Sequence, residues 1–72
     1  MNVSRIDLNL FTVFDVIYRE GGITAASKRL HLSQPAVSHA LARLREQLGD
    51  PLFERQGNEM IPTPRARALA ST

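Results

Sequence analysis

The stretch that decides the fold of this 72-residue chain is Thr24-Ala25-Ala26-Ser27-Lys28-Arg29-Leu30-His31-Leu32-Ser33-Gln34-Pro35-Ala36-Val37-Ser38. Thr24 and Ser33 are residue types that cap helices, because their hydroxyls accept hydrogen bonds from the free N–H groups of the first turn. Pro35 suits the first turn of a helix, where its missing N–H costs no hydrogen bond. The stretch therefore predicts a helix over residues 24–31, a tight turn at residues 31–32 and a further helix after Ser33.

The helix after Ser33 has one apolar and one polar face. At about 100° per residue, Leu41, Leu44 and Leu48 fall within about 40° of Val37. The opposite side carries Pro35, Ser38, His39, Ala42, Arg43 and Glu46. Gly49 ends the helix, because glycine reaches the left-handed conformation that closes helices. We expect the apolar face to pack and the polar face to lie in solvent.

The residues before this stretch predict another helix. Leu10, Phe14 and Ile17 recur at helical spacing, which indicates a helix over residues 7–20. Asp7 is a suitable N-cap, and the Gly21-Gly22 pair is a suitable end. We expect the aromatic residues Phe11, Phe14 and Phe53 to lie in the core, together with the leucines.

The residues after Gly49 predict a hairpin and a last helix. Two short alternating runs, over residues 52–55 and 60–61, flank Gly57-Asn58, a pattern typical of a small hairpin. Thr63 followed by Pro64 is a helix start, since proline is favoured at the first helical position. The predicted fold is mainly α: a winged helix-turn-helix with a three-helix core and a two-stranded wing, followed by the start of a further helix.

Composition and charge narrow the possible classes of protein. With 43% hydrophobic and 22% charged residues, the chain has the composition of one small globular domain. The net charge is only +2, but Lys28, Arg29, Arg43 and Arg45 against Glu46 give residues 23–49 a charge of +3. Cysteine is absent, which excludes disulfides and thiolate metal sites. We expect a cytoplasmic protein, since no long apolar segment or signal-like start is seen.

The polar face of the helix after Ser33 suits the major groove of duplex DNA. That groove is about 12 Å wide and admits one helix, whose N-terminal end meets the base edges. Gln34, Ser38 and His39 are polar and lack the bulk that would hold the helix out of the groove. Taken alone, the same side chains could form an ordinary solvated helix face.

Three motifs resemble the amino-terminal domain of LysR-type transcription regulators. They are the stretch over residues 24–38, Gly49-Asp50-Pro51-Leu52-Phe53 followed by Arg55, and Pro62-Thr63-Pro64-Arg65-Ala66. The resemblance runs from Leu8 onward, so it is far more specific than an isolated helix-turn-helix. It implies a bacterial winged helix-turn-helix DNA-binding domain over residues 1–62. Residues 63–72 would be the start of a truncated linker helix used for dimerisation.

The resemblance also implies roles for individual residues. It places the helix over residues 34–48 in the major groove and the wing, residues 52–61, at the adjacent minor groove. The candidate base contacts are Gln34, Pro35, Ser38 and His39, and the candidate backbone contacts are Ser33, Arg43, Arg55, Thr63 and Arg65. Arg43 and Arg65 could equally be plain surface cations. Arg45 could pair with Glu46 or Asp50.

Partners follow from the same resemblance. It implies double-stranded DNA with an interrupted inverted repeat, a homo-oligomer formed through the linker helix, and a small-molecule effector bound by a separate C-terminal domain. No cofactor, metal or membrane is expected. His39 stands where such regulators often carry arginine, and Glu54 and Glu59 flank the wing, where they are expected to weaken its attraction for phosphates.

An enzyme and a protein-docking module are the two rival classes for this chain. An enzyme would need a nucleophile with a base, or paired carboxylates in a cleft, and the chain offers only scattered surface candidates. His31 and His39 have no carboxylate or cysteine that would complete a metal site with them. A winged-helix docking module for another protein is the alternative function, because fold alone does not determine function. Such a module would expose large apolar side chains on the face where this chain carries Gln34 and Ser38.

Overall fold

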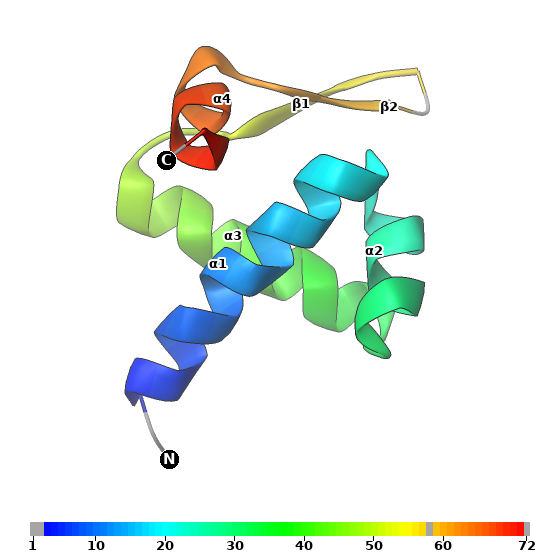
Figure 1. Ribbon diagram of the computed structural model, residues 1–72, viewed down its shortest axis with the longest axis vertical. Helices are drawn as coiled ribbons and strands as arrows, with labels where there is room; N and C mark the ends of the chain where they lie inside the picture. Colours follow the sequence, from blue (N-terminus) through cyan, green and yellow to red (C-terminus); the bar gives the residue numbers. More distant parts are fainter. Residues whose placement is uncertain (1–2, 58, 72) are drawn as a thin grey trace.

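The computed structural model describes residues 3–57 and 59–71, which form four helices and one two-stranded sheet (Figure 1). Side chains are described for residues 10–57 and 59–71. In chain order the elements are α1 (Val3–Glu20), α2 (Ile23–Leu30), α3 (Gln34–Leu48), β1 (Phe53–Gln56), β2 (Glu59–Pro62) and α4 (Pro64–Ala70). The order confirms the predicted mainly α fold, with a hairpin between the third and fourth helices.

The core forms where α1, α2 and α3 pack together, with α1 crossing α3 in Figure 1. Apolar side chains of all three helices meet there, and Leu52, Phe53 and Ala66 close the core from the wing and α4. The core side chains are Leu10, Val13, Phe14, Ile17, Ala26, Val37, Leu41, Leu44, Leu52, Phe53 and Ala66. The stripe predicted for α3 is therefore largely confirmed, although Leu48 is only half-buried.

An aromatic cluster ties the first strand to α1. The ring centroids of Phe14 and Phe53 lie 5.5 Å apart, and Tyr18 lies 6.0 Å from Phe14 and 6.4 Å from Phe53. All three pairs are tilted, an arrangement that the quadrupoles of aromatic rings favour over a face-to-face sandwich. The base of the wing is therefore packed against the helical core.

Most helix ends lie where the sequence predicts them. The Ser33 Oγ accepts a hydrogen bond from the Ala36 N–H at 3.1 Å, and Gly49 closes α3 with a φ of 64°. Thr63 caps α4 in the same way as Ser33 caps α3, with Pro64 in the first turn. His31, with a φ of 57°, closes α2, which agrees with its predicted place in the turn.

Two predicted helix starts are wrong. α1 begins at Val3, so Asp7 lies inside the helix and is not its N-cap. Residues 3–6 contain neither glycine nor proline, so nothing in them stops the helix from extending. The side chain of Asp7 lies outside the described side chains. α2 begins at Ile23 after an extended Gly22, which places Thr24 in the first turn rather than at the cap.

Two of the predicted core residues are exposed. Phe11 and Leu32 each keep 44% of their surface accessible. Phe11 follows the buried Leu10 directly, and one residue turns a helix by about 100°, away from the core. Leu32 lies in the α2–α3 turn, where its N–H donates to the Ser27 carbonyl at 2.9 Å. Phe11 and Leu32 therefore show that an apolar side chain is not sufficient for burial in this domain.

The hairpin is antiparallel and short. Its pairs are Phe53 with Pro62, Glu54 with Ile61, Arg55 with Met60, and Gln56 with Glu59. Gly57, with a φ of 63°, begins the turn in the left-handed region that favours glycine. Asn58, the other residue of the predicted tip, lies outside the described residues. The predicted wing is thus confirmed as a two-stranded sheet.

Candidate nucleic-acid interface

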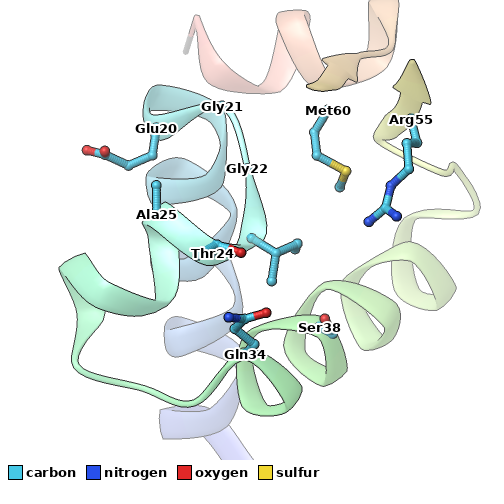
Figure 2. Close-up of a pocket in the computed structure, with 10 residues that line it drawn as sticks. Glu20, Gly21, Gly22, Thr24, Ala25, Gln34, Ser38, Arg55 and Met60 are labelled. Atoms are coloured by element: carbon cyan, nitrogen blue, oxygen red, sulfur yellow. The ribbon is translucent and has the colours of Figure 1, made fainter. Parts of the chain in front are cut away.

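A groove of about 310 Å³ lies between the two helices α2 and α3 and the two strands of the wing (Figure 2). Gln34 and Ser38 line it from α3, Thr24 from the first turn of α2, and Arg55 and Met60 from the two strands. In Figure 2, Met60 and Arg55 project from the wing toward the α3 wall that carries Gln34 and Ser38. The fold therefore places two predicted base contacts opposite a predicted backbone contact.

The groove continues along α3 toward its C-terminal half. A neighbouring hollow of about 280 Å³ is again lined by Ser38, Arg55 and Met60, and now also by Leu41 and Arg45. Arg55 is exposed and Met60 is half-buried. The wall between α3 and the wing thus combines two guanidinium groups with a hydroxyl.

His39 and Arg43 lie on the other flank of α3. They line a separate groove of about 310 Å³ with apolar side chains of α1 and the α2–α3 turn, among them Val13 and Leu32. At about 100° per residue, Pro35 falls between this flank and that of Gln34 and Ser38. Pro35, His39 and Arg43 are all exposed. The four predicted base contacts therefore share the exposed side of α3. Gln34 and Ser38 lie on one flank, His39 lies on the other, and Pro35 lies between them.

Ser33 combines a structural and an exposed position. Its Oγ accepts from the Ala36 N–H, while the residue itself is exposed at the N-terminal end of α3. A hydroxyl that accepts one hydrogen bond still carries its own proton as a donor. Ser33 can therefore cap α3 and present an O–H outward.

Substitutions of Ser33 are expected to separate these two roles. Ser33→Ala should lower the free energy of unfolding by about 0.5–2 kcal/mol, because the Ala36 N–H loses its partner. Ser33→Asp should keep the stability, since aspartate is an equally good cap, yet weaken binding to any polyanion because of its charge. Urea unfolding and duplex-DNA titration of both variants test this, with Ser33→Thr as the control that keeps cap and donor. Equal DNA affinity of Ser33→Asp and the unaltered chain would place Ser33 away from phosphates.

The charges of the wing are divided between its two faces. Arg55 and Met60 are paired across the strands and both line the α3 groove, so they share the inner face. Side chains alternate along a strand, which puts Glu54 and Glu59 on the outer face. The two glutamates are exposed, as expected, but they do not lie beside Arg55 on the groove. That the two carboxylates weaken the attraction of the wing for phosphates stays a prediction.

Thr63, a predicted backbone contact, and Arg45 both form hydrogen bonds within the domain. Thr63 is only 8% exposed, and its hydroxyl donates to Asp50 Oδ2 at 2.8 Å while accepting from the Ala66 N–H. Arg45 donates from Nε to the Pro51 carbonyl at 2.7 Å rather than pairing with Glu46 or Asp50. Arg65 is exposed on α4 and lines neither α3 groove. Thr63 and Arg65 therefore stand apart from the groove formed by α2, α3 and the wing, whereas Arg45 lines the continuation of that groove.

Sequence reasoning missed Thr24 and Met60 as groove residues and Arg45 as an internal donor. Arg45 lies about 80° from Val37 around the helix, at the edge of the apolar stripe. That position was a signal that its side chain could turn toward the domain. No local signal existed for Met60, because its position in the groove depends on the direction in which the wing extends relative to α3.

Within residues 3–57 and 59–71, histidine, aspartate and glutamate form no group of three or more that could hold a metal ion. None of the helices in that part of the chain is long and apolar enough to cross a membrane.

The three-helix core, the tight α2–α3 turn and the β1–β2 hairpin define a winged helix-turn-helix domain. The family model described as "Bacterial regulatory helix-turn-helix protein, lysR family" matches residues 8–67. The chain belongs to this lysR family of bacterial regulatory proteins. The family consists of regulators rather than enzymes, and DNA binding by a transcription regulator is the function that the match supports.

Similar proteins include one named Nodulation protein D 1 from Rhizobium meliloti (strain 1021), which is 54% identical over 70 residues, covering 97% of this chain and 23% of that protein. The crystal structure of a probable transcriptional regulator from Pseudomonas aeruginosa matches with a TM-score of 0.87 and 52% identity, over 96% of this chain and 23% of that one. A crystal structure described as a CbnR DBD–DNA complex matches with a TM-score of 0.83 and 30% identity, over 88% of this chain and 72% of that one. The chain spans about a quarter of the length of the curated relatives.

Proposed function

We propose that this chain binds duplex DNA sequence-specifically, with α3 in the major groove and the β1–β2 wing at the adjacent minor groove. The observation that carries the proposal is the convergence of Gln34, Ser38 and Arg55 on one groove from elements far apart in sequence. A structural neighbour described as a DBD–DNA complex supports DNA as the ligand. The recognition helix is α3.

The exposed surface of the recognition helix carries the base contacts. Gln34 can bond to adenine N6 and N7 together, and Ser38 can donate to or accept from a base edge. Pro35 offers an apolar ring for a thymine methyl, and His39 presents one donor and one acceptor when neutral. Because His39 cannot fork onto guanine as arginine does, we expect its base preference to be weaker than that of Gln34.

Backbone contacts come from residues around this surface. Ser33 donates from the N-terminal end of the recognition helix, and Arg55 attracts phosphates from the wing. Arg43 lies on the far flank of the helix and Arg65 on α4, where both can reach a phosphate of the flanking backbone. Thr63 leaves this set, because its hydroxyl is already bonded to Asp50 and Ala66. We assign Thr63 to holding α4 in place.

In the complete regulator, two copies of the domain would bind one operator together. We propose residues 1–62 as the winged domain and residues 63–72 as the start of a linker helix through which two copies associate, so that the operator is an interrupted inverted repeat. Ala66 is fully buried, so the first turn of α4 belongs to the same packed body as the wing. A further domain would bind a small-molecule effector. The regulator would act in the bacterial cytoplasm, on the nucleoid.

Gln34→Ala tests the base-reading proposal. We expect a loss of about 1–3 kcal/mol on the preferred duplex and a relaxed preference at one base position, because a two-bond contact to one base edge disappears. Selection of bound duplexes from a random pool, followed by titration at fixed salt, measures both quantities. Gln56→Ala is the matched control: the same change, on the outer face of the wing.

The outcome also separates the two candidate functions. A docking module for another protein would show weak DNA binding with no preferred sequence in the unaltered chain. If Gln34→Ala lost affinity but kept the base preference of the unaltered chain, Gln34 would not be a base-reading residue. The proposal that the chain binds DNA would still stand.

A further inference from the structure

A strained turn joins the recognition helix to the wing. Leu52 has a φ of 66°, a conformation that residues other than glycine rarely adopt. Across it, the Phe53 N–H donates to the Pro51 carbonyl at 2.7 Å, which makes a γ-turn. Turns of this kind are rare and strained, and such strain persists only where the surrounding structure imposes it. Leu52 is fully buried, so the strained residue is held inside the domain.

Arg45 of the recognition helix holds this turn at both ends. Its Nε donates to the Pro51 carbonyl at 2.7 Å, and its Nη2 donates to the Phe53 carbonyl at 3.4 Å. A guanidinium can make both bonds because its donors form a rigid planar fork, whereas an ammonium is a single point. One side chain of α3 thus bridges the residue before the turn and the first residue of the wing.

Asp50 holds the same turn from the other side. Its Oδ2 accepts from the Leu52 N–H at 2.8 Å and from the Thr63 hydroxyl at 2.8 Å. The Thr63 N–H in turn donates to the Leu52 carbonyl at 2.9 Å. Leu52 is therefore hydrogen-bonded to Asp50, which follows α3, and to Thr63, the cap of α4, while Arg45 of α3 bonds the residues on either side of it.

The direction of the wing depends on this joint. Arg55 follows Phe53 by two residues on the same strand face, about 7 Å further along at 3.3 Å per residue. Arg45 and Arg55 also line the same hollow beside Ser38. A rotation at the joint would therefore move the Arg55 guanidinium relative to the base-reading surface of the recognition helix.

We propose, resting on the function proposed above, that Arg45 and Asp50 are positioning residues for DNA recognition. They fix the direction in which the wing leaves the recognition helix, and so the place of Arg55 relative to the bases that Gln34 and Ser38 read. In this proposal Arg45 acts through Arg55, because its Nε and Nη2 hold the two carbonyls of the turn from which the wing begins.

A double-mutant cycle on the 72-residue chain tests this assignment. Arg45→Met, Arg55→Ala and the double variant are titrated with the preferred duplex over a range of salt concentrations. We expect each single change to weaken binding by roughly tenfold or more and to lower the slope of log affinity against log salt by about 1. The double variant should be no weaker than the weaker single variant, within about twofold, because both changes remove one contact.

Three results would overturn the assignment. If the two losses multiply, Arg45 and Arg55 act independently. If the double variant loses a second unit of salt slope, Arg45 contacts a phosphate itself. If Arg45→Met lowers affinity in proportion to its unfolded fraction, with the slope unchanged, Arg45 serves the fold alone. Absence of any sequence preference in the unaltered chain would instead reject the proposed function.

Asp50 provides a second, matched pair of variants. Asp50→Asn keeps an oxygen that can accept from both the Leu52 N–H and the Thr63 hydroxyl, whereas Asp50→Ala keeps neither bond. Asp50→Asn should retain the salt slope of the unaltered chain and Asp50→Ala should lose about 1 unit of it. The opposite order, or an equal loss in both, would contradict a role through these two hydrogen bonds. Arg45→Lys, whose three donors leave a single nitrogen and do not form a planar fork, should fall between the unaltered chain and Arg45→Met.

Discussion

Leu44→Ala is expected to remove a large share of the stability of the domain. Leu44 is fully buried on the packing face of α3, and truncating a buried leucine costs about 2–5 kcal/mol, since both the transfer energy and the filled space are lost. A chain of 72 residues is expected to have only about 4–11 kcal/mol of stability in total. The change should therefore lower the midpoint of urea unfolding sharply and leave a substantial unfolded fraction at 37 °C.

The matched control is Leu32→Ala. The chemical change is the same, but Leu32 keeps 44% of its surface exposed, so less area returns to water and no closed space is left. We expect a loss of less than about 1.5 kcal/mol there. Urea unfolding followed by circular dichroism measures both variants on one scale. Equal losses would mean that the packing of α3 on α1 is looser than the buried positions of Ile17 and Leu44 indicate.

Joining two copies of the chain is expected to strengthen DNA binding by about 10²–10⁴ relative to one copy. Two half-sites in successive major grooves lie about 34–36 Å apart, and a flexible Gly/Ser linker of about 40 residues matches that span on average. Once one copy is bound, the second meets its half-site at an effective concentration of order mM. Titration of a tandem fusion with an inverted-repeat duplex measures the gain.

The helical phase of DNA provides the control for this experiment. Inserting about 5 base pairs between the half-sites turns the second one to the opposite side of the duplex, where a copy held by a short linker cannot reach it. A second fusion with a shorter linker of about 15 residues is used for this control. Most of its gain should disappear on the shifted duplex. A gain that is the same on both duplexes, or on a single half-site, would show that linkage acts by charge and not by paired recognition. The unlinked chain should be mostly monomeric at micromolar concentration.

Much of the fold could be predicted from short stretches of the sequence. Ser33, Gly49 and Thr63 act on the backbone within three or four residues of themselves, so their roles as helix ends are readable without any tertiary information. The packing face of α3 is readable for the same reason, since 3.6 residues per turn align Val37 with Leu41 and Leu44. Thr24 shows the limit of this reasoning: it is a good cap, but the extended Gly22 before it starts the helix first.

The candidate site could be predicted only in part. The polar type of Gln34, Ser38 and His39 marks them as exposed, because such side chains on one face of an amphipathic helix have no apolar partner to pack against. Gln34 and Ser38 share a groove with Arg55, whereas His39 lines another groove. This difference depends on the side of α3 on which the wing lies. Thr63 has the same local signature as Ser33, yet it is buried and bonded to Asp50.

The sequence by itself determined the order of the elements, where most of the helices begin or end, and which side of α3 packs, because capping and helical periodicity are local. Tertiary structure decided the direction of the wing, the bonding of Arg45 to the turn after α3 and the burial of Thr63. These features depend on hydrogen bonds such as Thr63 to Asp50, which join residues 13 positions apart. Whether such residues meet depends on how the helices pack, which no short stretch specifies.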